Sequence, residues 1–157
     1  MMAVQEAARA LGAEWRGENA FFTGVSTDSR MVGRGDLFVA LRGEKFDGHE
    51  FVVTAKERGA VAAMVCQGAE TGNQELGISL ILVKDTRLGL GQLAAHWRGR
   101  FTIPLVAVTG SNGKTTVKEM IASILRQTAG GADRVLATEG NLNNDIGVPQ
   151  MLLRLRA

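Results

Sequence analysis

The feature that most constrains the fold of this chain is an apolar stretch followed by a glycine-rich turn and an amphipathic stretch. Residues 105–108 are Leu-Val-Ala-Val, and residues 109–116 are Thr-Gly-Ser-Asn-Gly-Lys-Thr-Thr. The apolar residues that follow have the i, i+3, i+4, i+7, i+8 spacing of a half-buried helix. They are Val117, Met120, Ile121, Ile124 and Leu125. This order predicts a buried strand over residues 105–108, a tight turn and then a helix.

Such a turn is suited to binding phosphate. Main-chain N–H groups and the positive end of a helix dipole converge where a strand turns into a helix. Gly110 and Gly113 let the backbone bend around an anion, Lys114 adds a positive charge, and Thr115 offers a hydroxyl to Mg²⁺. We therefore predict a nucleotide site with Lys114 as its catalytic residue and Thr115 as the metal ligand. Its residues are Gly110, Ser111, Asn112, Gly113, Lys114, Thr115 and Thr116.

One position departs from the general P-loop pattern. That pattern has a glycine five residues before Gly113, where this chain has Val108. The alternative interpretation is an ordinary tight connection between a strand and a helix. The order of apolar run, turn, lysine, two threonines and helix favours the nucleotide site.

The composition is that of a globular protein. Hydrophobic residues make up 45% and charged residues 22% of the 157 residues, which suit one large domain or two small ones. The formal charge is only +2 and basic residues are scattered among acidic ones, so we expect no nucleic-acid partner. Cys66 is the single cysteine, which excludes an internal disulfide framework. No stretch approaches the ~20 apolar residues of a membrane span, and we expect a cytoplasmic protein.

Elsewhere, short apolar runs alternate with helical patterns. This alternation predicts an α/β layer in which at least part of the sheet is parallel. Strands are predicted at 36–41, 61–66, 80–83 and 135–138, and helices at 4–11, 51–58, 85–100 and 148–155. We predict a first domain over 1–83, a connecting helix over 84–103, and the beginning of a second domain over 104–157. The second domain would have only two strands and two helices, which cannot cover both faces of its sheet. We therefore expect this chain to be a piece of a longer protein.

Two other patterns are interpreted as structural. Residues 89–94, Gly-Leu-Gly-Gln-Leu-Ala, fit the loose dinucleotide fingerprint. Their glycines lie inside a helical pattern, and no acidic residue follows about 20 residues later to hold a ribose. His49 and His96 lack partners at metal-ligand spacing, which argues against a zinc site.

Two polar clusters leave alternatives open. Asn141, Asn143 and Asn144 form either a turn with an N-cap or a set of amide donors to phosphate or sugar oxygens. Ser29 and Arg30 form either an ordinary turn or a hydroxyl and a fork suited to a phosphate.

Together these segments resemble the Mur ligases, the ATP-dependent amide-forming enzymes of peptidoglycan synthesis. Residues 27–30 (Thr-Asp-Ser-Arg) and 43–49 (Gly-Glu-Lys-Phe-Asp-Gly-His) are similar to the family's UDP-sugar-binding domain. Residues 109–116 are similar to its ATP loop, which accounts for Val108. Residues 140–149, Gly-Asn-Leu-Asn-Asn-Asp-Ile-Gly-Val-Pro, resemble the branch that joins D-alanyl-D-alanine to UDP-N-acetylmuramoyl-tripeptide.

The resemblance implies ATP and Mg²⁺ as cofactors and a monomeric enzyme. It implies transfer of the γ-phosphoryl group of ATP to the terminal carboxylate of the tripeptide. The amine of D-alanyl-D-alanine then attacks the acyl phosphate, and phosphate leaves. By the same resemblance, the substrate-binding residues are Thr27, Ser29, Arg30, Glu44, Lys45, Phe46, Asn141, Asn143 and Asn144.

The family also uses carboxylates, a modified lysine, a histidine and a C-terminal domain that these 157 residues do not contain. We therefore expect the chain alone to lack ligase turnover. Two alternatives remain open: the ligase that adds the third stem-peptide residue, and a nucleotide-binding module without catalysis. A general P-loop kinase or GTPase is disfavoured, because the first domain would then have no function assigned to it.

Overall fold

The molecule contains the parallel sheet that the sequence predicts. The structure is a computed structural model, and it describes residues 1–44, 46–69, 77–140 and 142–156. Its strands are β1 (Met2–Ala3), β2 (Glu14–Arg16), β3 (Phe21–Phe22), β4 (Gly24–Ser26), β5 (Asp36–Val39), β6 (Ala62–Cys66) and β7 (Ser79–Val83). Its helices are α1 (Val4–Leu11), η1 (Gly48–Phe51), α2 (Val52–Glu57), α3 (Thr86–Arg98), α4 (Lys114–Thr128), η4 (Ala132–Arg134) and α5 (Gly147–Leu152).

Five strands make the sheet, in the order β2-β7-β6-β5-β4. Strands β4 to β7 are parallel, and β2 pairs antiparallel with β7. The expected α/β class with a parallel sheet is confirmed. Strand β2 was not predicted, because three residues with two charges carry no strand signal by themselves. A separate two-stranded pair joins β1 to β3.

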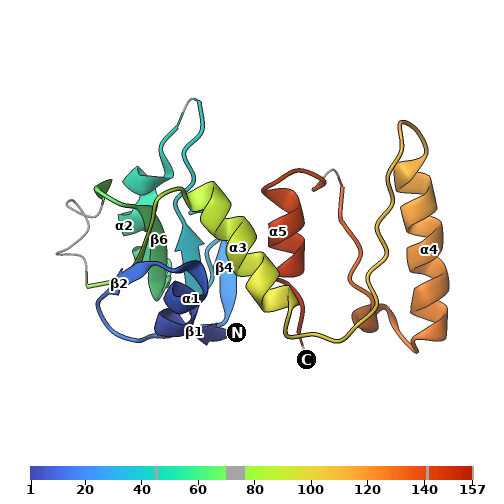
Figure 1. Ribbon diagram of the computed structural model, residues 1–157, viewed down its shortest axis with the longest axis horizontal. Coiled ribbons are helices and arrows are strands. Elements are labelled where there is room, and N and C mark those ends of the chain that lie inside the picture. Colours follow the sequence, from blue (N-terminus) through green and yellow to red (C-terminus); the bar gives the residue numbers. More distant parts are fainter. Residues whose placement is uncertain (45, 70–76, 141, 157) are drawn as a thin grey trace.

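Both faces of the sheet are covered, as Figure 1 shows. Successive side chains of a strand point to opposite faces, so β5 contributes Leu37 and Val39 to one core and Phe38 to the other. The first core contains buried residues of α1 and α3, and the second contains those of α2. This double coverage explains why β6 and β7 are almost wholly apolar.

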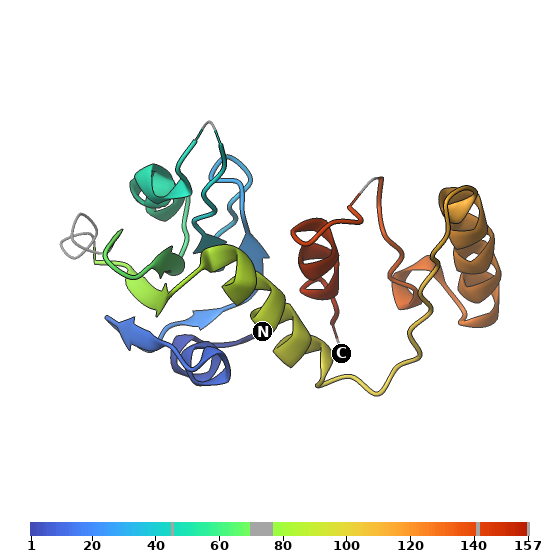
Figure 2. The ribbon, with the colours of Figure 1, turned by 45° about the horizontal axis from the view of Figure 1, so that its top comes forward.

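Helix α5 packs on the sheet-bearing part of the molecule. Leu153 and Leu155, just after α5, belong to the same apolar core as α1 and α3. The indole Nε1 of Trp97 donates to the carbonyl oxygen of Leu155 at 3.1 Å. Pro149 lies in the first turn of α5, where its missing N–H costs nothing. Figure 2 shows α5 beside α3 from a second direction.

Two predicted strands are absent, and those predictions are wrong. Residues 105–108 and 135–138 have no strand pairing in the part of the chain that the structure describes. Leu105 and Val106 are 68% and 58% exposed, so the run is not buried either. A strand forms only where a neighbour satisfies its N–H and C=O groups, and neither segment has such a neighbour among the described residues.

Helix α4 confirms the predicted helix but stands apart from the sheet, beyond α5 (Figures 1 and 2). Its expected apolar stripe is largely exposed: Met120 and Ile124 are each 61% exposed. Ala122 is its buried residue. None of the described helices has both the length and the apolar character needed to cross a bilayer.

Candidate functional site

The glycine-rich loop at the start of α4 adopts a conformation suited to an anion. Gly110 and Gly113 have φ values of 145° and 77°, a region that side chains rarely enter. The space beside the Gly113 α-carbon is open, since a β-carbon there would meet nothing within 4 Å. The Nζ of Lys114 donates to the carbonyl oxygens of Gly110 at 2.5 Å and Ser111 at 3.3 Å. The loop therefore curls around the ammonium group.

The N-terminus of α4 is open to a ligand. Its N-cap is Gly113, which has no side chain to cap the first turn. The first main-chain bond of the helix runs from Val117 to the carbonyl oxygen of Gly113 at 3.0 Å. The N–H groups of Lys114, Thr115 and Thr116 come before Val117 in the chain. They have no partner within the helix and point out of its N-terminus. A phosphate group suits these donors and the adjacent helix dipole.

The loop also fits Mg²⁺ held jointly with phosphate. Thr115 is exposed in the first turn of α4. The described residues contain no cluster of three or more His, Cys, Asp or Glu side chains able to hold a metal. Magnesium is commonly held by one or two protein oxygens together with phosphates and water. The hydroxyl of Thr115 fits that pattern.

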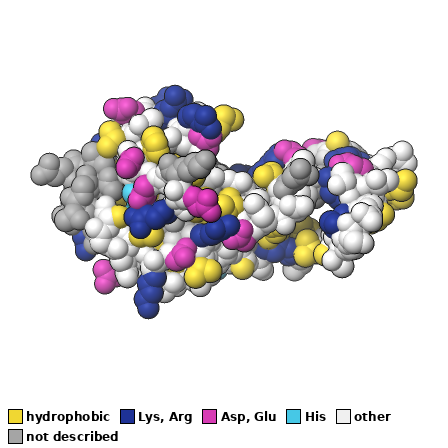
Figure 3. Space-filling model, turned by 90° about the horizontal axis from the view of Figure 1, so that it is seen from above, with side chains coloured by type: hydrophobic (Ala, Val, Ile, Leu, Met, Phe, Trp, Pro, Cys, Tyr) yellow, Lys and Arg dark blue, Asp and Glu magenta, His cyan; other side chains and the backbone are white. Residues whose placement is uncertain are grey.

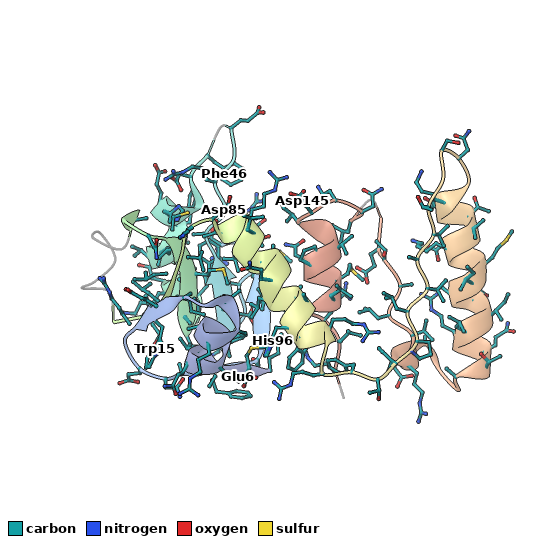
Figure 4. The ribbon with its side chains drawn as sticks, in the orientation of Figure 1. Glu6, Trp15, Phe46, Asp85, His96 and Asp145 are labelled. Atoms are coloured by element: carbon teal, nitrogen blue, oxygen red, sulfur yellow. The ribbon has the colours of Figure 1, made fainter. Side chains whose placement is uncertain are left out.

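A second set of residues gathers at the carboxyl ends of the parallel strands. Ligands of open α/β sheets bind beyond this edge. The segment after β4, the loop after β5 and the N-terminus of α3 all emerge there. Figure 4 shows Phe46, Asp85 and Asp145 at this same upper edge. The guanidinium of Arg87 pairs with Asp145, with one contact at 2.8 Å, and so ties the chain before α5 to α3.

A hollow of about 270 Å³ lies between the end of β4 and α5. Its walls include Thr27 and Asp28 on one side and Leu142, Gln150 and Arg154 on the other. The Nε2 of Gln150 donates to the hydroxyl oxygen of Thr27. Segments more than a hundred residues apart in sequence therefore line one hollow.

Asp28 orients Arg30 at the rim of this edge. The Nε and terminal nitrogen of Arg30 contact the Asp28 carboxylate at 3.0 and 2.7 Å. These bonds, with the N–H of Arg30, lower the pKa of Asp28 to about 2. The Arg30 side chain is 82% exposed. Exposed ion pairs contribute little free energy, so an incoming phosphate can share this guanidinium.

Asn144 of the asparagine cluster binds main-chain N–H groups at the start of α5, much as a capping side chain does. The Oδ1 of Asn144 accepts from the N–H groups of Ile146 at 3.2 Å and Gly147 at 2.7 Å. Its amide NH₂ group is not used in that cap. Asn143 is exposed. Lys45 and Asn141, also predicted to contact substrate, lie outside the described residues, whereas Glu44 and Phe46 are exposed on the loop after β5.

Three residues of this region were not predicted from the sequence. Gln150 in α5 and Arg154, two residues after its end, are four residues apart and line the same hollow. That spacing was a signal, but its meaning depended on where α5 packs. The sequence argued against His49 as a zinc ligand and gave it no role of its own within residues 43–49; it contacts Asp47 and the main chain of Cys66.

The surface charge is mixed. Figure 3 shows lysine and arginine side chains interspersed with aspartate and glutamate on the face that it presents.

The molecule is therefore an α/β protein with a doubly covered parallel sheet and, apart from that sheet, an open glycine-rich loop at a helix N-terminus. Comparison with known proteins identifies its family. Residues 21–98 match the Mur ligase family, catalytic domain, and residues 108–157 match the Mur ligase middle domain. The chain belongs to the Mur ligase family.

Three individual relatives show which members of the family this chain is similar to. The UDP-N-acetylmuramoyl-tripeptide--D-alanyl-D-alanine ligase of Haemophilus influenzae is 49% identical over 138 residues, which are 88% of this chain and 29% of that enzyme. The crystal structure of MurF from Acinetobacter baumannii is 40% identical, with a TM-score of 0.82, over 99% of this chain and 33% of that one. The MurF ligase from Thermotoga maritima in complex with ADP is 33% identical, with a TM-score of 0.67, over 85% of this chain and 29% of that one. The chain thus spans about a third or less of the length of these relatives.

Proposed function

We propose that this chain belongs to an ATP-dependent ligase that joins D-alanyl-D-alanine to UDP-N-acetylmuramoyl-tripeptide in peptidoglycan synthesis. The observation that carries the proposal is the open N-terminus of α4, with Lys114 enclosed by its loop, in a chain 49% identical to an enzyme of that name. ATP would supply the phosphoryl group that activates the terminal carboxylate as an acyl phosphate. The amine of D-alanyl-D-alanine would then displace phosphate.

The nucleotide is assigned to residues 110–116. Their N–H groups and Lys114 would neutralise the phosphate oxygens, and the Thr115 hydroxyl would hold Mg²⁺. The ADP bound by the Thermotoga maritima relative supports this assignment. Phosphoryl transfer depends on positioning and charge neutralisation, which these groups are suited to provide.

The UDP-linked substrate is assigned to the sheet edge. Thr27, Ser29 and Arg30 would contact it from the β4 side, and Glu44, Lys45 and Phe46 from the loop after β5. Asn141, Asn143 and Asn144 would approach from the segment before α5. The hollow shared by Thr27 and Gln150 supports a site built by both ends of the chain.

The proposed function gives each part of the chain a separate role. Residues 1–83 would bind the UDP moiety, residues 84–103 would connect, and residues 104–157 would begin the ATP-binding unit. We propose a monomer in the cytoplasm, where ATP and UDP-linked precursors are available.

Calorimetric titration tests the nucleotide assignment. The Lys114→Ala variant removes a charged donor from the loop, so its affinity for Mg²⁺-ATP is expected to fall about 10- to 100-fold. Its affinity for UDP-N-acetylmuramoyl-tripeptide is expected to stay within about twofold. Arg134→Ala, an exposed charge removed in η4, is the matched control and leaves both affinities unchanged. Equal ATP binding by Lys114→Ala and the unaltered chain would refute the assignment.

A chimera tests the reaction itself. This chain would replace the matching residues of the Haemophilus influenzae ligase, and phosphate release would be followed with D-alanyl-D-alanine and either the UDP-linked tripeptide or the UDP-linked dipeptide. Turnover with the tripeptide alone is the expected result. A folded chimera that prefers the dipeptide with a third-residue amino acid would favour the neighbouring ligase. A folded chimera that binds ATP without turnover would favour a non-catalytic module.

A further inference from the structure

The imidazole of His49 joins the loop after β5 to the end of β6. Its side chain is only 8% exposed. Its Nδ1 lies 2.5 Å from the Oδ1 of Asp47, and its Nε2 accepts from the main-chain N–H of Cys66 at 2.9 Å. Because Nε2 accepts a hydrogen bond, the ring hydrogen must be on Nδ1, which donates it to the carboxylate.

The N–H of Cys66 needs this partner. The bond from the N–H of Ala40 to the carbonyl oxygen of Met64 lies at the end of the β5–β6 pairing, after which β5 turns away. The N–H of Cys66 then faces the loop instead of a strand. A main-chain donor left unpaired at this depth would be costly. The Nε2 of His49 accepts the hydrogen bond of the Cys66 N–H in place of a carbonyl oxygen of β5.

Asp47 in turn closes the loop. Its carboxylate accepts from the Nε of Arg42 at 2.8 Å and from the N–H of His49 at 3.0 Å. Residues 42 and 47 pair in antiparallel fashion, and the N–H of Gly43 donates to the carbonyl oxygen of Phe46 at 2.9 Å. This one carboxylate therefore joins residues 42 and 49 at the base of the loop.

The tip carries an exposed aromatic side chain. Phe46 is 57% exposed, and its ring lies against Gly43, where a β-carbon would come within 2.6 Å of it. Glu44 is exposed beside it. Neither side chain is fixed by burial, so their placement relative to the sheet edge depends on the base of the loop.

We propose that His49 is a positioning residue that sets Glu44 and Phe46 of this loop for the UDP-linked substrate through its two hydrogen bonds. The inference rests on the proposed function, which assigns that loop to the substrate. His49 does not contact the substrate. It holds Asp47 at a fixed distance from β6, and Asp47 holds the loop.

Two conservative variants of the full chain separate the two bonds. In His49→Asn the amide nitrogen takes the place of Nδ1 and keeps the bond to Asp47, while the bond from Cys66 is lost. In His49→Gln the amide oxygen takes the place of Nε2 and keeps the bond from Cys66, while the bond to Asp47 is lost. Each variant is expected to bind UDP-N-acetylmuramoyl-tripeptide about tenfold more weakly by calorimetry. Affinity for Mg²⁺-ATP is expected to stay within about twofold.

His96→Gln is the matched control. His96 lies on α3, and its Nε2 is 3.4 Å from the carboxylate of Glu6, far from the loop in Figure 4. This variant is expected to keep both affinities. Variants of His49 that are folded and bind the UDP-linked substrate as tightly as the unaltered chain would overturn the positioning role.

A second measurement decides the matter if the variants do not fold or if the proposed function is wrong. Nitrogen-15 spectra of the unaltered chain report which ring nitrogen carries the hydrogen, and amide exchange reports the protection of the Cys66 N–H. A protonated Nδ1, a bare Nε2 and a protected Cys66 amide are expected. A hydrogen on Nε2 or rapid exchange at Cys66 refutes the bridge whatever the chain binds. Failure of the unaltered chain to bind the UDP-linked substrate would instead refute the proposed function.

Discussion

At the scale of single residues, two aspartates with similarly lowered pKa values have different consequences. Both Asp28 and Asp47 have a pKa of about 2. Asp28 owes it first to the exposed Arg30, a pair that water and salt screen. Asp47 owes it first to the N–H of His49, then to the side chains of His49 and Arg42, and its own side chain is 28% exposed. Asp47 is therefore the one expected to affect stability.

Asp47 predicts a dependence of stability on pH. A carboxyl whose pKa falls from 3.8 to about 2 on folding stabilises the folded state above pH 4. That contribution is lost as pH falls from about 4 to about 2. Urea unfolding at pH 6 should show Asp47→Asn less stable than the unaltered chain by about 2 kcal/mol, with the gap narrowing towards pH 2.5.

The control for this prediction is Asp133→Asn, which removes an exposed carboxylate in η4. Its free energy of unfolding should follow that of the unaltered chain at every pH. A gap for Asp47→Asn that stays constant from pH 6 to pH 2.5 would contradict the electrostatic explanation.

At the scale of elements, the dinucleotide-like pattern of residues 89–94 lies inside α3 and not in a turn before a helix. Gly89 lies over the sheet, where a β-carbon would come within 2.9 Å of the Sδ of Met64 and 3.4 Å of Val83. Gly91, two positions beyond it on the helix, faces open space. The first glycine allows close packing between helix and sheet, and the second has no such role.

The two glycines predict opposite effects of one substitution. Gly91→Ala should raise the free energy of unfolding by about 0.5–1 kcal/mol, because alanine favours the helix and meets nothing. Gly89→Ala gains the same propensity but must displace the fully buried Met64, so a net loss of about 1 kcal/mol is expected. Urea unfolding of the pair measures both. Equal effects of the two substitutions would show that packing against Met64 does not limit α3.

At the scale of the whole molecule, the chain has one well-packed body and one loosely attached helix. Helix α3 buries Leu90, Leu93, Ala94 and Trp97, and the chain after α5 adds Leu153 and Leu155 to the same core. Helix α4 has one buried residue, Ala122, which belongs to neither core of the sheet. Local stability follows the number of buried apolar contacts.

This difference predicts uneven hydrogen exchange in the 157-residue chain. Amides of α4 should exchange at least about tenfold faster than those of α3 and α5, because opening α4 exposes little apolar surface. Mass spectrometry of peptides covering the three helices measures the rates. The amides of α1 serve as an internal reference, since Val4, Ala7 and Ala8 place that helix in the core. Protection of α4 equal to that of α3 would contradict the prediction.

Local signals in the sequence determined most of the elements and the conformation of the glycine-rich loop before α4. Apolar spacing predicted α1 and α4, Asp85 caps α3, and short apolar runs predicted β6 and β7. The loop from Gly110 to Thr116 was predictable because turn glycines and a helix N-terminus act within a few residues. These features require no knowledge of distant parts of the chain.

Only the tertiary structure decided the features that depend on contacts with distant segments of the chain. The runs at 105–108 and 135–138 have strand-like sequences but no partner among the described residues, so they do not pair. Strand β2 forms because β7 offers it an edge. The contact of Gln150 with Thr27 and the bridge made by His49 required the packing of α5 and the departure of β5. Hydrogen-bond partners and apolar burial are supplied by residues far apart in sequence, and periodicity within one segment carries no information about them.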